Sequence, residues 1–133
     1  MVILVDTNII LDIYLNRGFD ESLKSIEKAT KHHDKLFFSS SSFTDFYYIA
    51  CSETHSKALA RKYAIDLAKR IHFADVTGIC IYKSLVSEIN DLEDALIDTV
   101  AFNVKADYIL TRNKKDFEQS KVKAITPKEF LSL

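Results

Sequence analysis

The strongest constraint on the fold is an apolar run that changes directly into a helical pattern. Residues Val2 to Val5 are all branched and apolar, and Asp6 follows them at once. From Ile9 onward, apolar residues recur at the three- and four-residue spacing of a helix. A short, wholly apolar strand followed by a helix is typical of a parallel sheet that is covered on both faces. The start of the chain therefore predicts an α/β fold.

The rest of the chain repeats this alternation. Short apolar runs predict strands at 2–5, 36–38, 76–78, 108–111 and 122–125. Helical spacing and capping residues predict helices at 9–15, 23–33, 43–50, 56–72, 79–87, 91–105 and from 127 onward. The segment 76–82 is ambiguous, and a short strand before the helix is favoured there. Together these elements predict one compact domain, residues 1–133, with a mainly parallel sheet.

Composition limits the class of protein. With 47% apolar residues, a chain of 133 residues is expected to be globular rather than disordered. No apolar run approaches the ~20 residues of a membrane span, the first residues lack the features of a signal peptide, and two cysteines make no disulfide framework. These observations predict a cytoplasmic protein. The net charge of −1 gives no global nucleic-acid signature, so such a partner would need a local basic patch or bridging metal ions.

Polar and mostly acidic residues follow the predicted strands or begin the next helices. Asp6 follows the first strand, and Asn113 and Asp116 follow the fourth. Asp45 and Asp94 lie in the first turns of helices that begin near the same edge of the sheet. Ligands bind at this edge in parallel α/β folds. Because gathered carboxylates repel one another, the set is best explained as a cage for a divalent cation, which predicts a metal-dependent hydrolase.

The acidic residues on the predicted helices also have a purely structural interpretation. Asp91 can cap the helix 91–105 with Asp94 at its third position, where Asp94 complements the helix dipole. Asp45 has the same explanation in its own helix. Asp98, one helical turn beyond Asp94, and Glu93 are most simply solvated helix charges.

Asp6 is harder to explain by structure alone. A carboxylate directly after a buried strand needs hydrogen-bond partners once water is removed from it. Thr7 and Asn8 are the nearest candidates for this support. The coincidence of several acidic residues at one sheet edge favours a functional site over separate structural roles.

Four segments carry a resemblance to a known family. They are VDTNIILD at 5–12, SSSFTDFYYIA at 40–50, DLEDALIDTVAFNVKADYILTRNKKDF at 91–117 and ITPKEFL at 125–131. In this order they resemble the PIN-domain family, especially the VapC-like toxin ribonucleases of prokaryotic toxin–antitoxin pairs. The resemblance implies a PIN-like three-layer α/β/α sandwich with a mainly parallel central sheet, metal-dependent nuclease activity and a homodimer.

The resemblance also assigns positions to the acidic residues. Asp6 matches the first metal-binding carboxylate and Asp94 matches the third acidic residue. Asp45 occupies the second acidic position, where many members have glutamate. Asn113 stands where a fourth acidic residue is common, and Asp116, three residues further on, takes over that function.

The implied reaction is hydrolysis of an RNA phosphodiester with Mg²⁺ or Mn²⁺. Asp6, Asp94 and Asp116 are expected to hold the metal, and Asp45 to orient a water molecule or bind the metal through it. The polar residues expected to support these carboxylates or to contact phosphate are Thr7, Asn8, Asp98, Thr111, Arg112, Asn113, Lys114 and Lys115. A small antitoxin protein is expected to cover the acidic cleft and to insert a basic side chain.

Two alternatives stay open at this point. A haloacid-dehalogenase-like phosphatase would use Asp6 as nucleophile, but those proteins need a second aspartate two residues on, where this chain has Asn8. A catalytically degenerate PIN domain would serve as a binding module, and Asn113 in an acidic position is the feature that keeps this alternative open.

Overall fold

The computed structural model describes residues 1–133 and contains one five-stranded sheet. The strands are β1 (Val2–Val5), β2 (Lys35–Ser39), β3 (His72–Ala74), β4 (Tyr108–Leu110) and β5 (Ala124–Ile125). Their order in the sheet is β3-β2-β1-β4-β5, and every neighbouring pair is parallel. The expectation of an α/β fold with a parallel sheet is confirmed.

Helices connect the strands. They are α1 (Thr7–Tyr14), α2 (Asp20–Lys31), α3 (Phe43–Thr54), α4 (Lys57–Arg70), α5 (Gly78–Leu85), α6 (Leu92–Asn103) and α7 (Pro127–Leu131), with 3₁₀ turns η1 (Ser40–Ser42) and η2 (Lys114–Phe117). Asp91 caps α6, and Pro127 opens α7 after the Thr126 cap, both as expected. No helix has the length and the apolar character that a membrane crossing requires.

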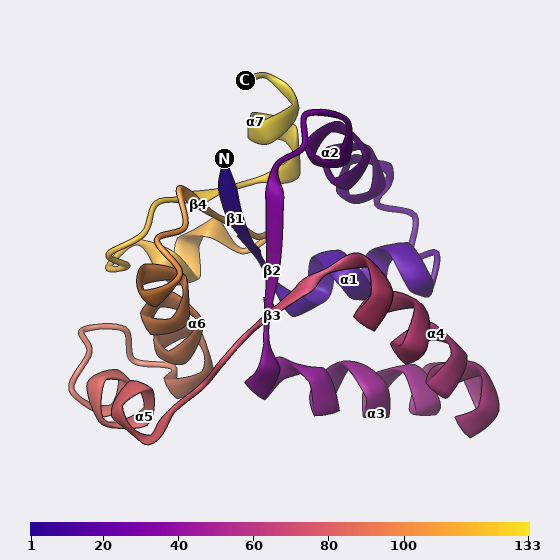
Figure 1. Ribbon diagram of the computed structural model, residues 1–133, viewed down its shortest axis with the longest axis horizontal. Coiled ribbons are helices and arrows are strands. Elements are labelled where there is room, and N and C mark those ends of the chain that lie inside the picture. Colours follow the sequence, from indigo (N-terminus) through magenta and orange to yellow (C-terminus); the bar gives the residue numbers. More distant parts are fainter.

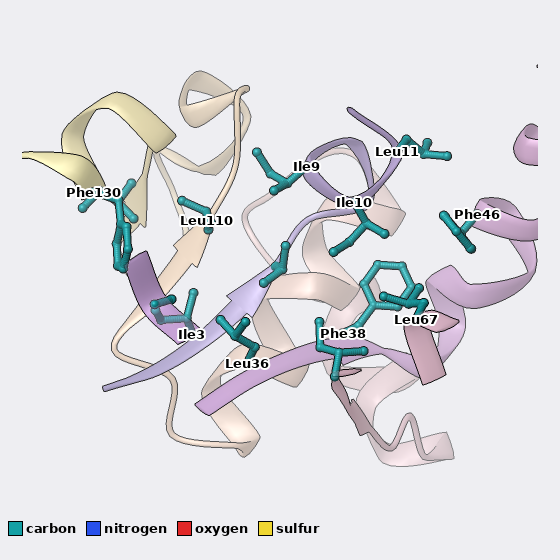
Figure 2. Close-up of a cluster of buried hydrophobic side chains, with 14 of the residues drawn as sticks. Ile3, Ile9, Ile10, Leu11, Leu36, Phe38, Phe46, Leu67, Leu110 and Phe130 are labelled. Carbon is teal, nitrogen blue, oxygen red and sulfur yellow. The ribbon is translucent and has the colours of Figure 1, made fainter. Parts of the chain in front are cut away.

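The helices cover the sheet on both faces, so the chain has three layers (Figure 1). Side chains alternate along each strand, which sends Ile3 and Val5 into one core and Leu4 into the other. The larger core joins the sheet to α1, α2, α3, α4 and α7, and Figure 2 shows part of it, with labelled side chains from the strands and from α1, α3, α4 and α7. The smaller core lies under α6, against which α5 packs. The three-layer α/β/α sandwich is therefore confirmed.

The third strand was predicted at the wrong place. Helix α4 ends at Arg70 instead of continuing to residue 72, and the strand β3 occupies His72–Ala74 beside β2. No strand forms at 76–78, because Thr77 caps α5 with its side chain. As a three-residue edge strand, β3 buries only Ala74, so no apolar run marks it in the sequence.

Candidate functional site

Asp6 stands where β1 ends and α1 begins. Its backbone N–H donates to the Leu110 carbonyl (3.0 Å), which sets β1 beside β4 at this edge. Its carboxylate accepts the Thr7 backbone N–H and the Thr111 hydroxyl, both at 2.8 Å. Burial raises the pKa of Asp6, against the opposing effect of these two hydrogen bonds. The carboxylate is thus buried and oriented, with hydrogen-bond donors but no bound cationic side chain.

Asp94 and Asp116 complete the centre of the site. Asp94 lies in the first turn of α6, where its backbone N–H donates to the Asp91 cap (3.0 Å). Burial raises the pKa of Asp94 to about 7, and the negative charges of Asp91, Asp6 and Asp116 add to this effect. Asp116, exposed on η2, also raises the pKa of Asp6. The structure therefore brings these three predicted carboxylates within electrostatic reach of one another.

Asp45 joins the cluster through Glu93. Burial raises the pKa of Glu93, and the next largest causes are the negative charges of Asp45 and Asp91, followed by Asp6. Glu93 is exposed, as expected of a solvated helix charge, but it also lies close enough to Asp45 for the charge of that carboxylate to raise its pKa. It directly precedes Asp94 at the start of α6, and that position at the sheet edge was the signal in the sequence.

The two neighbours of Asp6 behave differently from each other. Thr7 donates its backbone N–H to Asp6, while its buried hydroxyl has no hydrogen-bond partner. Asn8 does not contact Asp6, since its side-chain oxygen accepts from Arg17 (3.4 Å). Buried hydroxyls usually have partners, so the free Thr7 hydroxyl indicates that a ligand or solvent atom completes the site.

The segment after β4 supplies polar groups to this edge. Thr111 is fully buried, donates to Asp6, and accepts the Asn113 backbone N–H (3.0 Å). The Asn113 side chain is exposed next to these groups. Lys114 is paired with Glu129 at 2.8 Å, whereas Lys115 lines the same hollow as the carboxylates of the site centre.

Arg112 is paired with Asp12, a carboxylate outside the predicted site. Its guanidinium donates to both oxygens of Asp12, at 2.7 and 3.2 Å, and lies 3.9 Å from the centre of the Phe19 ring. The Asp12 side chain is fully buried and also accepts the Ser22 hydroxyl (2.8 Å). Arg112 therefore ties the end of β4 to α1 instead of pointing into open solvent as a phosphate contact. Asp12 is the one charged residue between positions 7 and 15, which was the signal for it.

Asp98 is a buried anchor and not a solvated helix charge. It is 4% exposed, and its carboxylate accepts the backbone N–H groups of Lys121 and Val122, both at 3.0 Å. It holds the segment between η2 and β5 against α6, so its support for the site is indirect.

Comparison with known proteins identifies the family. The family model of the PIN domain matches residues 2–115. The chain belongs to the PIN-domain family. No curated protein matches the sequence significantly.

Solved structures share the fold at low sequence identity. The VapBC2 complex of Rickettsia felis, bound to a promoter DNA fragment, contains a chain with a TM-score of 0.77 and 19% identity, covering 95% of this chain and 98% of that one. A toxin–antitoxin complex of Klebsiella pneumoniae gives 0.70 and 23%, over 93% and 96%. VapBC-1 of nontypeable Haemophilus influenzae gives 0.72 and 17%, over 96% and 99%.

Family membership decides between two of the alternatives. PIN domains are nucleases that generally use divalent metal ions, and the PIN match covers Asp6, Asp45 and Asp94 and the segment after β4 as far as residue 115. The phosphatase alternative loses its basis, because it rested only on an aspartate after the first strand.

The residues at the sheet edge fit a divalent cation by their chemistry. No three His, Cys, Asp or Glu side chains are placed closely enough to hold an ion as they stand. The donor set nevertheless consists of carboxylate oxygens, which Mg²⁺ and Mn²⁺ prefer, and their mutual repulsion adds to the effect of burial in raising the pKa of Asp94. A bound cation would remove this repulsion, so the PIN site suits a metal that draws its carboxylates together.

Proposed function

We propose that this protein is a Mg²⁺- or Mn²⁺-dependent endoribonuclease and the toxin of a type II toxin–antitoxin pair. The observation that carries the proposal is the set of carboxylates around Asp6, which repel one another and are not paired with cationic side chains of the chain itself. Such a set is costly to keep unless a cation binds it. The carboxyl edge of a parallel sheet is also the expected place for the substrate.

The residues of the chain have distinct parts in this reaction. Asp6, Asp94 and Asp116 would hold the metal, which supplies an activated water molecule and neutralises charge on the scissile phosphate. Thr111 and the Thr7 backbone fix the Asp6 carboxylate by their hydrogen bonds.

The remaining site residues handle protons and phosphate. The pKa of Glu93 is raised by its burial and by its neighbour Asp45, so this pair is suited to take a proton from an attacking water molecule. Asn113 provides an exposed amide at the fourth acidic position, and Asp116 supplies the charge that Asn113 lacks.

An antitoxin is the proposed protein partner. The solved structures with the same fold include toxin–antitoxin complexes of Rickettsia felis and Klebsiella pneumoniae. A basic side chain inserted among the carboxylates of this chain would be stabilised by their charge. The protein would act in the cytoplasm. Co-expression with the product of an adjacent small reading frame tests this partner, and the absence of a stable complex would argue against it.

A homodimer is the proposed assembly. The α5 segment exposes Ile79, Tyr82, Leu85 and Val86, which are 66, 74, 62 and 84% exposed. A contiguous apolar face of this kind is uncommon on a monomer, and a twofold axis would let two copies cover it mutually. Light scattering of the wild type and Tyr82→Glu tests this assembly, since the wild type should have twice the mass of the variant.

The test of the nuclease activity compares charge-neutral variants of the site with a matched control. Asp6→Asn and Asp94→Asn should lower metal-dependent RNA cleavage by about a hundredfold or more, because each removes charge from the metal site. Asp20→Asn, an exposed aspartate at the start of α2, should keep the wild-type rate. Full activity of either site variant, or wild-type cleavage in excess EDTA, would contradict the proposal.

A second measurement addresses the degenerate alternative. Calorimetry with Mn²⁺ should show binding to the wild type and weaker binding to Asp94→Asn. A wild type that binds no divalent ion and cleaves no RNA would instead support a binding module.

A further inference from the structure

We propose that five exposed lysines around the loop between η2 and β5 form a track that binds the phosphate backbone of the RNA substrate. This lysine track consists of Lys105, Lys114, Lys115, Lys121 and Lys123. The inference rests on the proposed ribonuclease function, and it adds the surface over which a single strand reaches the carboxylates. A chain with a net charge of −1 needs such a local concentration of positive charge to bind nucleic acid.

The track is continuous with the carboxylate site. Lys115 lines the hollow that also holds Asp94 and Asp116. The adjoining hollow is lined by Lys115, Lys121 and Lys123, by Lys114, which is also paired with Glu129 at the surface, and by one acidic residue, Glu118. Because the two hollows share Lys115 and Glu118, phosphates bound along the lysines would lie next to the hollow of Asp94 and Asp116.

A third hollow extends the track along the outer edge of the sheet. It shares Lys121 and Lys123 with the second hollow and adds Lys105 and Phe102. Phe102 lies two turns of α6 beyond Asp94, a rise of roughly 12 Å along the helix. The track therefore spans more than one phosphate of an extended strand.

The loop that presents these lysines is held rigidly. The buried carboxylate of Asp98 accepts the backbone N–H groups of Lys121 and Val122. The Ser120 hydroxyl donates to the Phe117 carbonyl at 2.7 Å. A rigid loop binds with a smaller loss of conformational entropy. A loop that a buried carboxylate holds in place is therefore better suited to bind a ligand than a loop that only connects two elements.

Phe102 adds a place for a base. Its side chain is 54% exposed, and the Lys121 Nζ lies 5.3 Å from the centre of its ring. An exposed aromatic ring beside a phosphate-binding cation is the usual arrangement in proteins that bind single-stranded nucleic acid without reading its sequence. The ring favours a nucleic acid over an acidic polypeptide, for which lysines alone would suffice.

Some of these lysines have a simpler explanation, the protection of the edge strand β5 from pairing with other chains. Lysines beside an edge strand such as β5 discourage pairing with other chains. That explanation applies to Lys121 and Lys123, but it does not account for Lys115 beside the carboxylates or for the exposed Phe102. The exposed basic side of α4 provides the control, because Lys62 and Lys69 carry the same charge on another element.

Binding is tested in the cleavage-deficient Asp6→Asn background with a fluorescein-labelled single-stranded RNA of 20 nucleotides. Lys121→Ala/Lys123→Ala should weaken binding about tenfold and reduce the salt dependence of the logarithm of affinity by about 1.4, or about 0.7 for each phosphate contact. Phe102→Ala should weaken binding at least about fivefold with the salt dependence unchanged. Lys62→Ala/Lys69→Ala removes equal charge and should leave both quantities near the starting values.

Cleavage by the otherwise wild-type protein separates this inference from the proposed function. The double lysine variant should raise KM for the same RNA and keep kcat within about twofold, since it removes binding remote from the reaction. Equal losses of RNA affinity in the lysine double variant and in the α4 variant would overturn the track. It would also be overturned if poly-glutamate displaced the labelled RNA as well as unlabelled RNA does, from both the wild type and Phe102→Ala. If the wild type cleaves RNA and the track variants match it, the track is refuted and the ribonuclease stands. RNA neither bound nor cleaved by the wild type would refute both.

Discussion

Asp12 and the carboxylates around Asp6 lie near the same edge of the sheet, and a cationic side chain of the chain itself is paired only with Asp12. Asp12 is fully buried, yet both of its oxygens accept from Arg112 and one also accepts from Ser22. Asp6 has a hydroxyl and a backbone N–H as donors; the charge of Arg112 lowers its pKa and that of Asp116 raises it, but no cationic side chain forms an ion pair with it. Burial of a charge is thus compatible with this fold where a cation accompanies it.

The difference indicates which carboxylates exist for folding and which for function. The Asp12–Arg112 pair joins α1 to the end of β4, and it is complete without any ligand. Burial and the charges of neighbouring carboxylates both disfavour the ionised form of Asp94 in the folded chain, and no cationic side chain is paired with it. Substitutions in the two groups should therefore have opposite effects on stability.

The largest effect on stability is expected for Asp12→Ala. It leaves the partly buried Arg112 without its partner and should lower the free energy of unfolding by about 3 kcal/mol. Urea unfolding measures the change. Glu53→Ala breaks the exposed pair with Arg17 and should cost less than about 1 kcal/mol.

A double substitution checks the cause of that loss. Asp12→Leu combined with Arg112→Met replaces the buried pair by apolar side chains and should recover most of the stability. If Asp12→Ala were as stable as the wild type, the distinction between a structural and a functional carboxylate at this edge would be lost.

A smaller loss of stability is expected for Thr111, which donates to Asp6 and directly precedes Arg112. Thr111→Val keeps the shape but removes the hydroxyl that donates to Asp6, and should cost about 1 to 2 kcal/mol because the buried carboxylate loses a donor. RNA cleavage should fall about tenfold, with KM less affected than kcat. Thr30→Val, which removes an exposed hydroxyl bound to its own helix, is the control and should change neither quantity appreciably.

The sequence was informative where a residue's environment is set locally. The apolar run before Asp6 and the capping residue Asp91 predicted the strand, the helix start and the shared edge. Five strands were expected and five are present, but β3 was misplaced because its pairing with β2 depends on residues distant in the chain.

The missed features all depend on tertiary contacts. Asp12 and Arg112 are 100 residues apart, so their pairing is invisible to local patterns. Asp98 was interpreted as a solvated charge because its partners are the backbone N–H groups of residues 121 and 122. Every residue except proline has such a group, so the sequence does not indicate the pairing. The proximity of Glu93 to Asp45 was not predicted either, since only the folded chain brings the starts of α3 and α6 together.

The smallest effect is a pH dependence of the metal-free protein. The pKa of Asp94 rises from 3.8 to about 7 on folding, so between these pH values the folded chain retains a proton that the unfolded chain releases. This stabilising contribution is complete below about pH 4 and is lost as the pH rises towards 7. The site is partly open to solvent, so screening reduces the loss to about 1 kcal/mol.

Urea unfolding in EDTA at pH 5 and pH 8 tests this contribution. Asp94→Asn should show a smaller decrease between the two pH values than the wild type, while Asp20→Asn should follow the wild type. Mn²⁺ at a hundred times its Kd should raise the free energy of unfolding of the wild type at pH 8 by about 2.7 kcal/mol, because it binds only the folded chain. If Asp94→Asn and the wild type lost the same stability with rising pH, the carboxylates would not repel one another in solution. The contrast with the neutralised Asp12 would then have no energetic basis.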